Sequence, residues 1–117
     1  MAFRFETLNV WKQARQFSGV IYSTVERFPR HEAYGLTSQL HRAANAVPLL
    51  IAEGSALPSK RLFHHRLGLA QGEIAEVACA IFLALDRGYL DEPTQLGLYH
   101  DSQSLARQIQ SLKETLG

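Results

Sequence analysis

Four side chains within one predicted helix have the types that bind metals or carry out acid–base chemistry: Glu73, Glu76, His64 and His65. Di-iron bundles hold their ions with Glu-x-x-His pairs, because residues three apart on a helix aim both ligands at one point. Glu73 and Glu76 have this spacing, but the residue three positions further on is Cys79 rather than a histidine. His64 and His65 are adjacent, so on a helix they point about 100° apart and chelate poorly. We therefore predict no metal ligand, and no cofactor is expected.

Other catalytic patterns are also missing from the sequence. Cys79 has alanine and isoleucine neighbours, which predicts a small packed hydrophobe rather than an activated thiolate. His31 and Glu32 are not followed by the second histidine of a zinc protease, and no serine lies in a Gly-x-Ser-x-Gly elbow. We predict no catalytic residue and no enzyme; a metal-dependent enzyme using His64, His65 and the glutamate pair is the third-ranked alternative.

A basic cluster is the most suggestive polar feature. Lys60, Arg61 and Arg66, with the two histidines, lie in the first two turns of a predicted helix, where the helix dipole favours acidic groups. Such a cluster predicts a nearby anion, either a nucleic-acid phosphate or glutamates of this or a neighbouring subunit. The residues predicted to contact RNA or DNA are Arg42, Lys60, Arg61 and Arg66.

Charge is unevenly distributed along the 117 residues, although the net charge is only +1. Up to Arg66 there are nine basic and four acidic residues, and from Leu67 onward three basic residues face seven acidic ones. This asymmetry fits a nucleic-acid footprint, and it equally fits two parts of a bundle that attract one another within or between subunits.

Apolar residues recur every three or four positions in four segments, which is typical of helices that share one core. The spacing predicts helices over residues 8–28, 34–54, 59–87 and 92–116. Pro29 ends the first helix, Ser59 and Asp91 are predicted N-caps of the last two, and Pro93 lies in the first turn of the fourth. We predict an all-α, antiparallel up-and-down four-helix bundle that forms a single domain over residues 1–117.

The second predicted helix contains Pro48, which removes one backbone hydrogen bond at a cost of about 3 kcal/mol in an exposed helix. We therefore predict a kink at Pro48. The core seam of this helix is expected at Leu36, Leu40, Ala43, Val47, Leu50 and Gly54. A second stripe lies off that seam, and we predict it to be a subunit interface because an apolar second face must be covered. The stripe consists of Arg42, Ala46, Leu49 and Glu53.

Several sequence runs are similar to a known family. The run "FPRHEAYGLTSQLHRAANAVPLLIAEG", with "FETLNVWKQA" upstream and "LGLAQGEIAEV" and "RGYL" downstream, resembles the four-helix bundle proteins encoded within intervening sequences of bacterial 23S rRNA genes. The resemblance implies a cytosolic bundle that assembles as a ring-like homopentamer and whose biochemical role is largely unassigned. It also implies a distant similarity to the accessory variability determinant of diversity-generating retroelements, a pentamer that binds nucleic acid and a reverse transcriptase. Leu49 and Leu50 replace the small residue and asparagine typical of the family, which favours an apolar contact surface.

The sequence lacks a run of about 18 uninterrupted apolar residues, and its start has no secretory signal pattern. We therefore expect a cytoplasmic protein with no membrane partner. The leading hypothesis is a non-enzymatic homo-oligomer, a pentamer by resemblance, that acts as a binding or scaffold module. The second hypothesis is RNA or DNA binding through the basic cluster, together with a protein partner.

Overall fold

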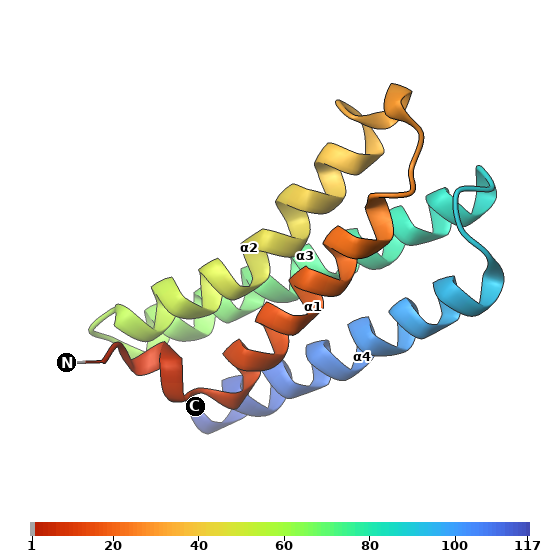
Figure 1. The fold of residues 1–117 in the computed structure, drawn as a ribbon. Helices are drawn as coiled ribbons and strands as arrows, with labels where there is room; N and C mark the ends of the chain where they lie inside the picture. Colours follow the sequence, from red (N-terminus) through yellow and green to blue (C-terminus); the bar gives the residue numbers. More distant parts are fainter. Residues whose placement is uncertain (1) are drawn as a thin grey trace.

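A computed structural model describes residues 2–117, and it is built from helices and their connections (Figure 1). The elements in chain order are η1 (Arg4–Thr7), α1 (Asn9–Val25), η2 (Arg30–Glu32), α2 (Leu36–Ala56), α3 (Lys60–Asp86) and α4 (Glu92–Thr115). Within residues 2–117 there is no strand, and the four long helices pack as an antiparallel bundle, which confirms the predicted fold class.

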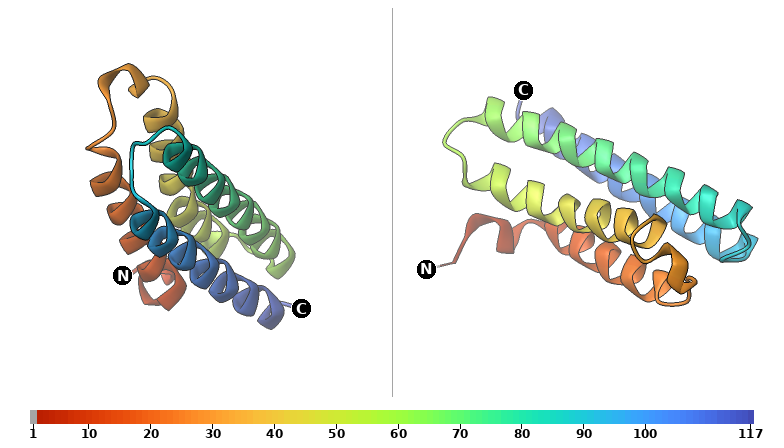
Figure 2. Two further views of the ribbon diagram at one scale, coloured as in Figure 1. Left: turned by 90° about the vertical axis from the view of Figure 1, so that its right-hand side faces the viewer. Right: turned by 90° about the horizontal axis from the view of Figure 1, so that it is seen from above.

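The two views of Figure 2 show the four helices running along one long axis, with short connections at the two ends. α2 packs most extensively against α3, while the seam between α1 and α4 is the least extensive of the four. The core contains Phe17, Ile21, Leu40, Phe63 and Ile109, all almost fully buried.

The observed helix ends lie within three residues of the predicted ones, and the start of α4 at Glu92 coincides with the prediction. α1 ends at Val25 rather than at Phe28, because Phe28 lies in the following turn, where its ring packs 5.4 Å from that of Tyr89. α2 continues two residues beyond Gly54 and remains helical on both sides of Pro48. The kink at Pro48 stays a prediction.

Side-chain caps fix the starts of the last two helices, as the sequence predicts. Ser59 Oγ accepts a hydrogen bond of 3.1 Å from the backbone N–H of Leu62 at the start of α3. Asp91 Oδ1 accepts one of 2.9 Å from Thr94 N at the start of α4, and the bonds to Thr94 lower the pKa of Asp91.

One helix, α3, is long and apolar enough to span a bilayer by length and composition, with a mean hydropathy of 1.5 over 18 residues. The core helix of a globular bundle passes the same test, and 39% of that window is buried inside the structure. The cytoplasmic location therefore stays a prediction.

Candidate functional site

The outer stripe of α2 is tied to α3 by ion pairs at both ends. Arg42 Nη1 donates to Glu73 Oε2 over 3.1 Å, and Arg42 Nη2 donates to Glu76. The hydrogen bond to Glu76 is the main reason that the pKa of Arg42 is raised above its ordinary value. Glu53 accepts a bond of 2.8 Å from Arg66 Nε. The charged residues of the predicted interface stripe thus have partners on the neighbouring helix of the same chain.

The predicted phosphate contacts divide into two pairs. Arg42 and Arg66 are occupied by carboxylates of this chain, which is the alternative that the basic cluster left open. Lys60 and Arg61 are exposed in the first turn of α3, and within residues 2–117 neither forms an ion pair. Of the four predicted residues, only Lys60 and Arg61 can therefore meet an outside anion without first breaking an ion pair.

Between the ion pairs, α2 exposes apolar surface. Leu49 is 66% exposed, and Ala46 is half-buried. Leu49 lines a hollow of about 380 Å³ together with Phe5, Trp11, Pro48 and Ala52. A second hollow of about 640 Å³ shares Phe5 and Ala52 and continues along the N-terminal segment past Phe3, which is 67% exposed. We call this surface the α2 groove and define it by Phe3, Phe5, Trp11, Pro48, Leu49 and Ala52.

The walls of the α2 groove are held in place by aromatic packing. The ring of Phe5 packs edge-on to Trp11 at 4.7 Å and stacks on Phe3 at 5.7 Å. Glu6 holds the segment in a short 3-10 turn by accepting a bond of 2.8 Å from Phe3 N. Because these residues lie more than thirty positions from Leu49 in the sequence, the helical pattern of α2 did not indicate them. Their aromatic character was the one available signal.

A second feature that the sequence analysis missed lies at the opposite end of the bundle. Glu32 is buried, and it accepts hydrogen bonds from Leu36 N (3.1 Å), Arg87 Nη1 (2.8 Å) and the Tyr89 hydroxyl (2.7 Å). The bond from Tyr89 is the main reason that the pKa of Glu32 is lowered, and the same bond raises the pKa of Tyr89. Both carboxylate oxygens of Glu32 take part in this network, so we interpret it as a structural link between α2 and the α3–α4 turn.

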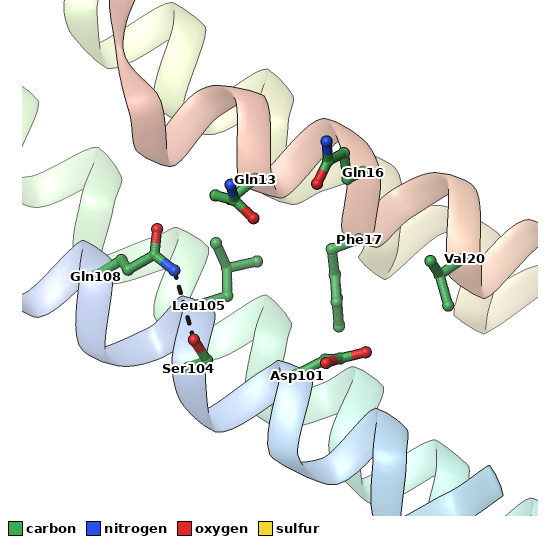
Figure 3. A pocket seen from close by; sticks show the side chains of 8 residues that line it. All are labelled: Gln13, Gln16, Phe17, Val20, Asp101, Ser104, Leu105 and Gln108. Carbon is green, nitrogen blue, oxygen red and sulfur yellow. Dashed lines mark hydrogen bonds between the residues drawn. The ribbon is translucent and has the colours of Figure 1, made fainter.

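A polar cavity of about 150 Å³ lies in the seam between α1 and α4 (Figure 3). Gln13 and Gln16 line it from α1, and Asp101, Ser104 and Gln108 line it from α4. Gln108 Nε2 donates to Ser104 Oγ over 3.4 Å, while its buried Oε1 has no partner within residues 2–117. Within those residues no side-chain hydrogen bond joins the two helices here, so the polar side chains of the cavity do not link α1 to α4 directly.

The residues considered for metal chemistry do not come together. Across residues 2–117 no group of three His, Cys, Asp or Glu side chains is placed to hold a metal ion. Glu73 and Glu76 bind Arg42, while His65 Nδ1 lies 3.1 Å from Arg66 Nη1. The prediction that Cys79 is packed was wrong, because its side chain is exposed.

Comparisons with known proteins agree with this fold. The family model of the 23S rRNA-intervening sequence protein matches residues 6–111. A crystal structure of a Bacteroides thetaiotaomicron protein of unknown function, assigned to the S23 ribosomal protein family, superposes with a TM-score of 0.78 at 18% identity. The match covers 88% of this chain and 96% of that one. A search of the curated proteins gave no match. The chain belongs to the 23S rRNA-intervening sequence protein family, which confirms the resemblance seen in its sequence.

Proposed function

We propose that the protein is a non-enzymatic homo-oligomeric bundle that acts as a binding or scaffold module, a pentamer by family resemblance. The observation that carries this proposal is the exposed apolar α2 groove around Leu49. A contiguous exposed apolar surface that includes aromatic side chains and has a polar rim is typical of a surface that another protein covers. Arg42 and Glu53, the charged residues of the stripe, form ion pairs with α3. Their side chains therefore do not cover the apolar groove.

Light scattering on the chromatographed protein tests the proposal. The wild type should have about five times the 13.1 kDa mass of one chain at micromolar concentration. Leu49→Asp should reduce that mass, because a carboxylate would replace the exposed leucine at the centre of the apolar contact and would have to lose its hydration there. Tyr34→Asp is the matched control, since Tyr34 is 100% exposed and lies outside the groove. A monomeric wild type would remove the proposal.

Nucleic-acid binding is the second candidate function, and Lys60 and Arg61 favour it. Both are exposed without ion pairs within residues 2–117 and lie beside His64 at one end of the bundle. In an oligomer each cation recurs once per subunit, which strengthens the field felt by a phosphate backbone. Arg42 and Arg66 would contribute only after releasing their glutamates.

Filter binding with structured RNA over a series of salt concentrations tests this candidate. Lys60→Gln and Arg61→Gln should each weaken retention and reduce the slope of log affinity against log salt by about 1. Arg42→Gln is the control and should change the slope less, because its guanidinium is engaged by Glu73 and Glu76. Retention that does not respond to salt would exclude this function.

A further inference from the structure

The rim of the α2 groove carries positive charge. Arg15 lies over the ring of Trp11, with 5.7 Å between the guanidinium carbon and the ring centroid. Arg4, which also lines the groove, lies over the ring of Phe63 at 5.3 Å. Within residues 2–117 neither arginine forms an ion pair. The acids at this rim are already bonded, Glu6 to Phe3 N and Glu53 to Arg66. The groove therefore favours an apolar partner with acidic edges.

A surface of that chemistry exists elsewhere on the same chain. Phe82 on α3 is 46% exposed, Leu96 on α4 is 44% exposed, and the ring of Tyr99 lies edge-on to Phe82 at 5.8 Å. Asp86 lies one helical turn after Phe82, and Glu92 lies one turn before Leu96. We call this surface the α3–α4 patch and define it by Phe82, Leu96 and Tyr99.

The acids beside the α3–α4 patch are available to a partner. Asp86 and Glu92 are exposed, and neither forms an ion pair in the part of the chain from residue 2 to residue 117. The nearest arginine in sequence, Arg87, is held by Glu32. His100 is a further titratable neighbour, with its ring 6.0 Å from that of Tyr99, and Arg27 acts on Asp91, the residue before Glu92. The apolar centre and the acidic edges of the α3–α4 patch thus complement the apolar floor and the basic rim of the α2 groove.

The two surfaces lie toward opposite ends of the bundle. The α2 groove is built by α1, α2 and the N-terminal segment, near the end where α2 passes into α3, whereas the patch lies toward the α3–α4 turn (Figure 1). The bundle is 44 Å long and 24 by 20 Å across. Because the groove and the patch are different surfaces, a contact between them leaves one patch and one groove of the pair free for further copies.

We propose that copies of the chain associate head-to-tail, with the α2 groove of one copy receiving the α3–α4 patch of the next. The inference rests on the proposed homo-oligomer and names the partner surface of its exposed groove. Each copy then uses one groove and one patch, so successive copies can form a closed ring or an open filament.

Mixing two variants tests the inference. Leu49→Asp removes the groove and Phe82→Asp removes the patch, and both side chains are exposed enough for the bundle to fold, which circular dichroism checks. Each variant alone should be monomeric. An equimolar mixture should give a one-to-one heterodimer, because Leu49→Asp retains the patch and Phe82→Asp retains the groove.

Other outcomes are equally decisive. If Phe82→Asp or Leu96→Asp keeps the wild-type mass, or if the mixture remains monomeric, the head-to-tail contact is refuted while the homo-oligomer itself survives. A two-fold groove-to-groove contact would leave Phe82→Asp assembled. Only a monomeric wild type would remove the homo-oligomer, so the two proposals fail on different samples.

Discussion

Replacing Gly54 with alanine tests whether the close approach of α2 to α3 depends on a missing side chain. A Cβ at Gly54 would lie 2.7 Å from Cδ1 and 3.3 Å from Cε1 of Phe63, and 3.0 Å from Cβ of Arg66. Phe63 is 2% exposed, so its ring cannot turn aside without displacing the core. The neighbouring backbone or the ring must shift by several tenths of an ångström.

Two effects of opposite sign determine how much Gly54→Ala changes the free energy of unfolding. Alanine favours a helix interior over glycine by about 1 kcal/mol, whereas overpacking a core contact costs about 1–3 kcal/mol. We expect Gly54→Ala to lose up to about 2 kcal/mol of unfolding free energy. Urea unfolding followed by helical circular dichroism measures this loss, at one fixed protein concentration because assembly adds concentration-dependent stability.

Gly72→Ala is the matched control. Gly72 also lies inside a helix, but a Cβ there meets nothing within 4 Å. This variant should gain up to about 1 kcal/mol. In a Phe63→Leu background, Gly54→Ala should cost less than in the wild type, because the clashing ring is gone. If Gly54→Ala raises stability as much as Gly72→Ala does, the packing argument at Gly54 is refuted.

Three further predictions concern groups at other points of the bundle. The lowered pKa of Glu32 means that its ionised form stabilises the fold above the ordinary value of 4.5, and that this stability is lost as pH falls through the folded pKa. Urea midpoints should therefore fall more on acidification for the wild type than for Glu32→Gln, and equal falls would contradict the network. Ser59→Ala should cost about 1 kcal/mol by removing the cap of α3, measured in the same urea assay, and an unchanged midpoint would show that the cap is dispensable. Cys79, which is exposed, should react with a thiol reagent in the folded protein at a rate that urea raises only slightly; strong protection would place it in a contact.

The fold could be predicted from the sequence because its determinants are local or periodic. Ser59 and Asp91 cap helices through atoms only three residues away, and the three- and four-residue spacing follows from helix geometry. The core seam of α2 was less well predicted, because Leu50 is half-buried while Ile51 is fully buried. α2 packs against both α1 and α3, so its buried face is wider than the single seam that the pattern assumed.

The candidate site was predicted less completely. The exposure of Leu49 follows from its position off the seam, but the aromatic walls around it depend on where the N-terminal segment packs. Helical spacing shows one face of one helix and carries no information about such a tertiary contact. The error at Cys79 was avoidable, since a residue two positions after the seam residue Val77 points about 200° away from it.

The charged residues of the two halves of the chain fall into two groups: those that form ion pairs within one copy, and those that form none. Within residues 2–117, basic and acidic side chains pair across the halves at Arg42, which binds Glu73 and Glu76, and at Glu32, which binds Arg87. Among the cations that form no ion pair within residues 2–117, two sets bear on function and lie at different places.

Arg4 and Arg15 border the α2 groove, and Lys60 and Arg61 begin α3. Asp86 and Glu92, two acids without an ion pair within residues 2–117, flank the apolar α3–α4 patch, whereas Lys60 and Arg61 lie apart from that patch at the start of α3. The two functions therefore use separable residues. A protein that loses RNA retention through Lys60 and Arg61 while keeping its mass would show that assembly and nucleic-acid binding are independent properties of the bundle.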